Sequence, residues 1–198
     1  MKKSSGLVLV LILLATGAGF GQKRSAFYLQ PQITLLNGTQ SVDGALGFSS
    51  GVEWGPWQFG GSAEIDFYEK RSVPFYAEAK RFFGNQKKRP FVYAGAGANF
   101  AWPTEFQRFY YYDWIGGGQF YTPSTFEHGR YLQGGIGVQL QSKTGKGFSI
   151  SLGYSSKTMT EKWVETTWDP STTTTIKTNR SIKYEFNRVD IKLGFRVF

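Results

Sequence analysis

Hydrophobic and polar residues alternate along most of the chain from residue 27 onward. In residues 148–155 large and small side chains alternate from one residue to the next. Residues 188–198 also alternate, with apolar residues on one side and mostly charged residues on the other. Successive side chains of a β-strand point to opposite faces of its sheet. The alternation therefore predicts a sheet with one apolar face and one polar face.

The same pattern recurs in separate segments, which we predict to be eight strands. They cover residues 27–36, 45–54, 59–67, 75–83, 91–100, 131–141, 148–155 and 188–198. Most of these segments have about nine to eleven residues, the length with which a tilted strand crosses a bilayer.

The connections between these strands alternate in length. Short turns are predicted at residues 55–56, 84–90 and 143–147, and longer links at 37–44, 68–74, 102–130 and 157–181. Trimmed turns on one side and longer loops on the other are typical of an up-and-down barrel. We predict an all-β fold, an eight-stranded antiparallel up-and-down transmembrane β-barrel.

Aromatic residues make up 18% of the chain and gather near the predicted strand ends. Amphipathic rings collect at the two lipid–water interfaces of a membrane barrel. The predicted girdles are Phe27, Trp54, Trp57, Phe59, Phe83, Phe91, Phe148 and Phe198 at the short turns, and Phe67, Tyr68, Phe75, Tyr76, Phe100, Trp102, Tyr131 and Tyr154 at the longer links.

Residues 1–21 have the features of a cleaved secretory signal peptide. Lys2 and Lys3 precede an apolar run at residues 7–14, and small residues follow up to Gly21. The apolar run is too short for a membrane-spanning helix, so a retained anchor is the weaker interpretation. We expect cleavage after Gly21, which leaves residues 22–198 as the outer-membrane β-barrel.

Cysteine is absent and the formal charge is +9 at pH 7. The first fact excludes disulfides, thiolate metal sites and a lipidated N-terminal cysteine. With an export signal, the basic charge favours outer-membrane lipid and lipopolysaccharide as partners, and not nucleic acid. We expect the cell outer membrane as the location of the protein.

The polar faces of the predicted strands carry charges of both signs. The barrel interior of eight strands is just wide enough for side chains to fill it, and buried charges there require partners. We predict a plugged lumen, with a narrow conduit as the alternative. The predicted lumen network is Glu53, Glu64, Asp66, Glu78, Lys80, Asp190, Lys192 and Arg196.

The third long link, residues 102–130, is rich in aromatic residues. Rigid amphipathic rings are favoured at binding surfaces. The candidate binding surface is Phe109, Tyr110, Tyr111, Tyr112 and Trp114. The preferred interpretation, however, is that these rings pack on one another and cap the barrel mouth. The fourth link, from Thr158 past Trp163 and Trp168, is predicted to extend two strands beyond the membrane.

Catalytic chemistry has little support in the sequence. The single histidine, His128, lies in a predicted loop without a histidine–serine pairing, and no metal-ligand spacing occurs. We predict no catalytic residue, no cofactor and no metal.

The leader, the alternating strands and the ending at residues 193–198 resemble the small OmpA/OmpX-type outer-membrane barrels, which are often labelled porin-like. The resemblance covers most of the chain and implies that Phe198 is an assembly signal for the barrel-assembly machinery. One departure is that the positions alternating with Phe198 hold Arg196, Gly194 and Lys192, whereas Phe195 and Leu193 belong to the apolar face.

The resemblance and the composition together predict a monomeric, non-catalytic protein of a Gram-negative envelope. It would support envelope integrity or bind an unknown extracellular partner through its loops. The alternative is a narrow porin that passes small solutes or ions, and the weaker alternative is a lipid-modifying barrel enzyme.

Overall fold

The computed structural model describes residues 26–84, 87–108, 110–115, 118–142, 146–169 and 171–197. For residues 110–115, 118–123, 166–169 and 175 only the backbone is described. The predicted signal peptide, its cleavage after Gly21 and the terminal Phe198 lie outside these residues and stay predictions.

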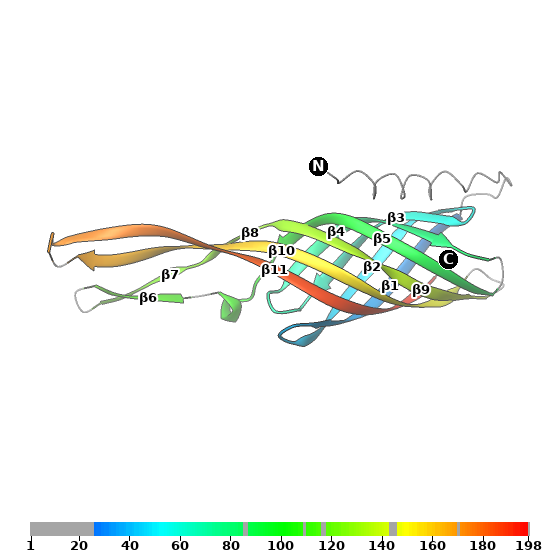
Figure 1. The fold of residues 1–198 in the computed structure, drawn as a ribbon, viewed down its shortest axis with the longest axis horizontal. Helices are drawn as coiled ribbons and strands as arrows, with labels where there is room; N and C mark the ends of the chain where they lie inside the picture. The colour runs from blue at the N-terminus through cyan, green and yellow to red at the C-terminus, as the bar shows by residue number, and fades with distance from the viewer. Residues whose placement is uncertain are drawn as a thin grey trace, which may run out of the picture.

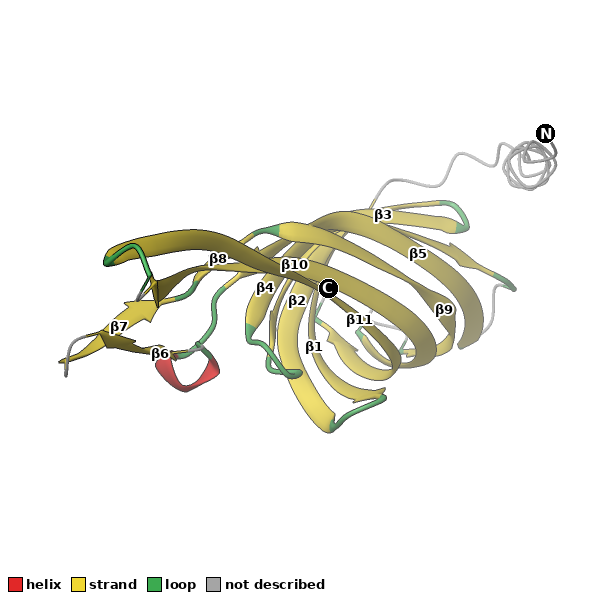
Figure 2. Ribbon diagram, turned by 60° about the vertical axis from the view of Figure 1, so that its left-hand side comes forward, coloured by secondary structure: helices red, strands yellow, loops and turns green. Residues whose placement is uncertain are grey.

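One antiparallel sheet forms the body of the protein and closes into a ring (Figures 1 and 2). The ring closes because β11 pairs with both β10 and β1. This confirms the predicted all-β fold of eight antiparallel strands in sequence order. The strands of the ring are β1 (Ala26–Gly38), β2 (Val42–Trp54), β3 (Trp57–Asp66), β4 (Ser72–Phe82), β5 (Lys88–Ala101), β9 (Gly129–Gln141), β10 (Gly147–Asp169) and β11 (Thr174–Arg196).

Turn chemistry fixes the short connections. The β2–β3 hairpin turns at Gly55, whose φ is 61°, and the link from β4 to β5 passes through Gly84, whose φ is 78°. Residues that carry a Cβ rarely adopt this left-handed backbone conformation, so glycine is favoured at these two turn positions. Short turns keep each strand beside the next one in the sequence.

The two faces of the ring differ in polarity along every strand. On β11, Leu193 and Phe195 are exposed on the outside, whereas Lys192, Asp190 and Arg196 are buried inside. On β1, Ile33 is exposed and Gln32 is buried. A closed barrel leaves its ring strands no free edge within this body, and the alternation decides which residues reach the interior.

Strand parity corrects part of the predicted aromatic girdles. Tyr68, Tyr76, Phe91 and Tyr131 are buried inside the ring, although the sequence analysis placed them at the lipid interface. Tyr76 and Tyr131 stack with their ring centroids 4.9 Å apart. Outward rings remain at both ends of the barrel: Phe27, Trp54, Phe59, Phe83 and Phe148 at the short turns, and Phe67, Phe75, Phe100, Trp102 and Tyr154 at the other end.

The hairpin formed by β10 and β11 continues far beyond the ring (Figure 1). Pairing of β10 with β9 ends at Lys157 and Tyr131, and pairing of β11 with β1 ends at Arg188 and Gly38. The two strands then pair with each other as far as Asp169 and Thr174. We call residues 158–187 the projecting hairpin, and its regular pairing confirms the predicted extension of these strands.

Short elements that the sequence analysis did not anticipate lie in the third long link. They are a 3-10 helix (Glu105–Gln107), β6 (Tyr110–Ile115), β7 (Gly118–Pro123) and β8 (Thr125–Glu127). β8 pairs with β10 at the base of the projecting hairpin. Within the described part of the chain, no helix is long and apolar enough to cross a membrane.

Adjacent glycines on β3 provide a test of the inner and outer faces. A Cβ at Gly60 would fall on the Tyr28 hydroxyl and the Ser50 carbonyl oxygen, whereas a Cβ at Gly61 meets nothing within 4 Å. We expect Gly60→Ala to lower the free energy of unfolding by about 1–3 kcal/mol, because the interior would be overpacked. The measurement is urea unfolding of the refolded protein, followed by tryptophan fluorescence.

The matched control is Gly61→Ala, which should change the free energy of unfolding by less than about 0.5 kcal/mol. Equal destabilisation by the two substitutions would contradict the assignment of Gly60 to the inner face and Gly61 to the outer face.

Candidate functional site

The interior of the ring is lined by charged and polar side chains from every ring strand. The structure places all eight residues of the predicted lumen network on the inner face, and Glu53 is the one that is only partly buried. Their polar contacts form three clusters along the barrel axis and one pair between them. They follow one another from the short turns toward the projecting hairpin.

The first cluster lies near the short turns and centres on Glu53 of β2. Arg89 Nη1 lies 2.8 Å from Glu53 Oε1, and Arg196 donates to Glu53 Oε2. Arg89 also donates to Gln141 Oε1 at 2.9 Å. Two guanidinium groups from β5 and β11 therefore share one carboxylate and connect strands on different sides of the ring. Arg89 was not among the residues predicted for the lumen.

The second cluster fills the middle of the lumen around Lys192 of β11. Its Nζ lies 3.0 Å from Glu64 Oε1 on β3 and also donates to Gln133 Oε1 on β9. Gln133 in turn donates to Glu78 Oε2 at 3.0 Å, and Glu78 Oε1 lies 2.9 Å from Lys80 Nζ. This chain of contacts crosses the barrel interior.

Two further side chains donate hydrogen bonds to the Glu64 carboxylate. Gln32 Nε2 donates to Glu64 Oε1 at 2.7 Å, and the Tyr76 hydroxyl donates to the same oxygen. A buried carboxylate that accepts several hydrogen bonds and faces a cation is well stabilised compared with an isolated one.

Asp190 lies between the second and third clusters. Its Oδ1 accepts a hydrogen bond of 3.0 Å from the Tyr93 hydroxyl on β5. An inward glycine provides room for this contact, because a Cβ at Gly153 would collide with the Tyr93 hydroxyl. Small residues opposite large ones allow a narrow barrel to hold side chains of this size.

The third cluster lies at the end of the ring from which the hairpin projects, and centres on Asp66 of β3. Lys157 Nζ lies 3.0 Å from Asp66 Oδ1, and Arg188 donates to Asp66 Oδ2. Lys157 also donates to the carbonyl oxygens of Tyr68 and Lys70, each at 2.8 Å. Both cations are almost completely buried and reach from β10 and β11 to β3 on another side of the ring.

Lys157 and Arg188 were missed as lumen residues by the sequence analysis. The seventh strand was predicted to end at residue 155, which left Lys157 in a predicted loop. The signal was present in the alternation, since Ser151, Ser155 and Lys157 continue one inward face. With these two residues and Arg89, the lumen contains enough cations to match the predicted carboxylates.

Another polar group lies just beyond the ring, at the base of the projecting hairpin. Glu161 accepts hydrogen bonds from the Ser124 hydroxyl and from the Tyr184 hydroxyl, the latter at 2.8 Å, and Lys70 Nζ lies 3.6 Å away. Burial raises the pKa of the Tyr184 phenol above its ordinary value, and the hydrogen bond to Glu161 raises this pKa further. Tyr184 therefore stays a neutral donor to Glu161 at ordinary pH.

The aromatic stretch of the third link follows the projecting hairpin. The β6–β7 hairpin lies beside the extension of β10 and away from the barrel mouth (Figures 1 and 2). The capping interpretation therefore does not fit the backbone of this stretch. Phe109 lies outside the described residues, as do the side chains of Tyr110, Tyr111, Tyr112 and Trp114, so their role as a binding surface stays a prediction.

His128 lies on the outside of the barrel, between β8 and β9. Its Nδ1 accepts a hydrogen bond of 3.2 Å from the Ala101 backbone N–H, and its ring packs on Phe100. The described residues contain no group of three or more histidine, cysteine, aspartate or glutamate side chains that could hold a metal ion.

No protein-family model and no curated protein matches the chain. The resemblance to the small OmpA/OmpX-type barrels therefore stays a prediction. Among solved structures, the chain is similar to Neisserial surface protein A (NspA), with 15% sequence identity and a TM-score of 0.44. The alignment covers 87% of this chain and 98% of that one.

The central ion pair provides a test of the lumen network. Removal of Lys192 would leave Glu64 as a buried charge without its cation, so we expect Lys192→Met to lower the free energy of unfolding by about 3–5 kcal/mol. The double variant Glu64→Gln/Lys192→Met should recover a large part of this loss, because it removes both charges. Urea unfolding of the single and double variants measures the coupling between the two residues.

A matched control is Lys162→Met on the projecting hairpin. Lys162 pairs with Glu127, but their side chains are 49% and 56% exposed, so the substitution should cost less than about 1 kcal/mol. Additive effects of Glu64→Gln and Lys192→Met would show that the two side chains are not coupled.

Proposed function

We propose that this protein is a non-catalytic outer-membrane β-barrel with a plugged lumen, which holds the projecting hairpin on the cell surface for contact with an extracellular partner. The barrel provides the anchor in the membrane, and the hairpin provides the surface that reaches beyond it.

The apolar outer face supports the membrane location. Outward positions of the ring carry exposed side chains such as Ile33, Leu46, Ile136, Ile150 and Leu193. A continuous apolar band is unfavourable in water and favourable against lipid. On β11 this band ends at Val189. Toward the projecting hairpin, the next outward residues are Asn187, Glu185 and Lys183. The projecting hairpin is therefore suited to water.

The observation that carries the plugged lumen is the set of contacts across the barrel interior. Lys192 connects β11 with β3 and β9, and Arg188 and Lys157 connect β11 and β10 with β3. An ion that passed along the axis would have to break several charge-assisted hydrogen bonds at once. This favours a structural interior over the alternative of a narrow porin.

A surface role is supported by the construction of the projecting hairpin. The pairing of β10 and β11 continues without interruption from the barrel into the hairpin. Across the hairpin, Arg180 Nε lies 2.6 Å from Glu165 Oε2. Exposed Ile176 and Ile182 lie on β11 beyond the ring. Exposed apolar residues on a rigid support are a frequent feature of protein interaction sites.

The surroundings of His128 support the non-catalytic part of the proposal. Its Nδ1 accepts a hydrogen bond from the Ala101 backbone N–H, and the contacts of the described residues place no nucleophile beside it. The lipid-modifying alternative predicts altered lipid A in cells that express the protein. Mass spectrometry of lipid A from cells with the wild-type protein and with His128→Ala separates the two interpretations.

The membrane location and the plugged lumen are tested with the purified protein. We expect the unboiled protein to migrate faster than the boiled protein in SDS gel electrophoresis, because a closed barrel resists the detergent. In planar bilayers the folded protein should show no stable open channel. Absence of the faster band, with the protein in the soluble periplasmic fraction, would contradict the membrane location, and stable conductance would contradict the plug.

A second test concerns the independence of the hairpin from the barrel. Removal of residues 163–180, with residues 162 and 181 joined by an Asn-Gly turn, leaves Lys157, Arg188 and Asp66 in place. We expect the shortened protein to give the same heat-dependent shift as the full chain. Lys157→Met is the contrasting variant, and it should destabilise the barrel because Asp66 loses a buried partner. Loss of the folded band in the shortened protein would show that the hairpin is needed for folding.

A further inference from the structure

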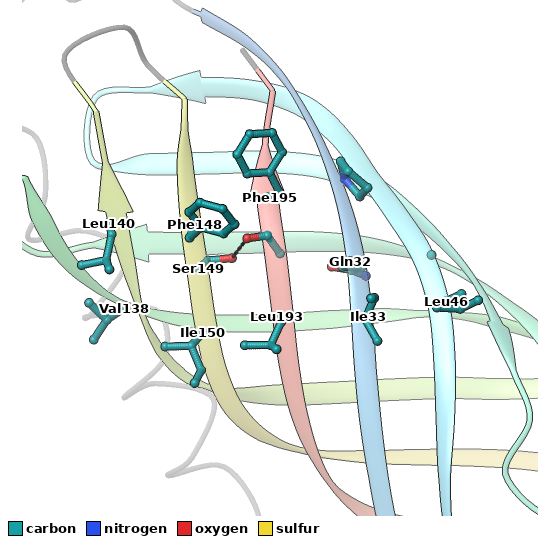
Figure 3. A pocket seen from close by; sticks show the side chains of 13 residues that line it. Gln32, Ile33, Leu46, Val138, Leu140, Phe148, Ser149, Ile150, Leu193 and Phe195 are labelled. Atoms are coloured by element: carbon teal, nitrogen blue, oxygen red, sulfur yellow. Dashed lines mark hydrogen bonds between the residues drawn. The ribbon is translucent and has the colours of Figure 1, made fainter.

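The outer surface of the barrel is hollowed near the short turns. An apolar groove of about 650 Å³ crosses β9, β10, β11, β1 and β2. Figure 3 shows two rows of side chains along it, one of them nearer to the end of β9 and the start of β10. Residues in a row are register partners on neighbouring strands. The farther row is Val138, Ile150, Leu193, Ile33 and Leu46, and the nearer row includes Leu140, Phe148 and Phe195.

The groove continues toward the short turns into a second hollow with a basic end. This hollow, of about 370 Å³, shares Leu140, Phe148 and Phe195 with the first and is also lined by Lys87, Lys88 and Lys146. Lys88 is the register partner of Leu140, so it stands at the end of the nearer row. Three lysines, one at the start of β5 and two in the connections before β5 and before β10, therefore meet one apolar groove.

The three lysines are exposed, and none of them forms an ion pair with a carboxylate of the described residues. Arg89, the next residue along the chain from Lys88, points into the lumen instead and pairs with Glu53. Among the residues that the structure describes, the basic end thus has no carboxylate partner for its charge, and the apolar part has no side chain that covers it. A ligand that satisfies both needs a phosphate group and a hydrocarbon chain.

We propose that this groove binds one anionic phospholipid of the inner leaflet of the outer membrane. Its phosphate lies between Lys87, Lys88 and Lys146, and one acyl chain lies over Phe148 and Phe195 toward Leu193. The inference rests on the proposed location in the outer membrane. It follows from the position of the lysines at the short turns, opposite to the projecting hairpin and thus in the leaflet that contains phospholipid and not lipopolysaccharide.

The groove discriminates by charge. A zwitterionic headgroup brings its own cation close to the lysines, which reduces the attraction, whereas a phosphatidylglycerol headgroup carries a net negative charge. The ring centroids of Phe148 and Phe195 are 4.9 Å apart, and the two rings form the apolar surface next to the phosphate position. The bound lipid would be distinguished from the surrounding bilayer by headgroup at this one position on the barrel.

Native mass spectrometry of the folded, full-length protein in detergent tests the proposal. The probes are dioleoylphosphatidylglycerol and dioleoylphosphatidylcholine at equal concentration. We expect one tightly retained phosphatidylglycerol per protein and a clear preference over phosphatidylcholine. The variant Lys88→Gln/Lys146→Gln should reduce this preference by roughly fivefold for each lysine removed.

The matched control is Lys177→Gln/Lys183→Gln, which removes the same charge from exposed positions of the projecting hairpin. It should leave the preference unchanged. Equal retention of the two lipids by the wild-type protein would overturn the proposal. So would an equal loss of preference in both variants, because net charge alone would then explain the binding.

The role of the apolar groove is tested by competition with sn-glycerol 3-phosphate, which has the phosphate but no acyl chain. A large excess should fail to displace the lipid, and displacement would overturn the acyl-chain part of the proposal. A heat-dependent shift in SDS gel electrophoresis is recorded on the same samples. Its presence without lipid preference refutes the lipid site alone, whereas its absence refutes the membrane barrel itself.

Discussion

The requirement that charges in a narrow interior have partners governs the rest of this structure. The lumen holds carboxylates from β2, β3, β4 and β11, and each of the clusters around Glu53, Glu64 and Asp66 is balanced by a cation from another strand. Such contacts contribute little net stability compared with a well-packed apolar core, yet the loss of one partner is costly. The ion pairs therefore act as a strong constraint on register, because a shift of one residue would turn Lys192 or Arg188 toward the outside.

Tyrosine side chains fill the space between the charged groups, and inward glycines leave room for them. Tyr28, Tyr76, Tyr93 and Tyr131 are buried in the lumen, and Gly60, Gly97 and Gly153 lie where a Cβ would collide with a neighbour. The phenol hydroxyls of Tyr76 and Tyr93 donate to Glu64 and Asp190. The inside of the barrel is thus a packed polar core, whereas the outside is apolar, which reverses the arrangement of a water-soluble β-sandwich.

The alternation of side chains was sufficient to predict the ring strands, their order and the inner face, because parity is a local property of the sequence. It also placed Glu64, Asp66 and Lys192 on one side. It failed for Lys157, because the predicted strand was given only the length needed to cross a bilayer, whereas β10 continues beyond the ring. It misplaced Tyr76 and Tyr131, because position near a strand end was given more weight than parity.

Other features depend on contacts between distant segments, which alternation does not encode. Pairing of β8 with β10 and the course of the β6–β7 hairpin beside the projection follow from tertiary packing of the third link. The hydrogen bonds of Gln107 with the backbone of Glu69 and Arg71 likewise join two loops far apart in the sequence. The charge pattern of the turns was visible in the sequence, but the apolar groove that reaches Lys88 requires the register of five strands.

The uninterrupted pairing of β10 and β11 also has a mechanical consequence. A pull on the tip of the projecting hairpin loads both strands along their length, in the direction of the barrel axis. The load passes into the ladders that join β10 to β9 and β11 to β1, where the hydrogen bonds are sheared together and are not opened one after another. Arg188 and Lys157 lie where these ladders begin, and both are tied to Asp66. Tension on the projecting hairpin would therefore be resisted at the mouth of the barrel before it reached the rest of the ring.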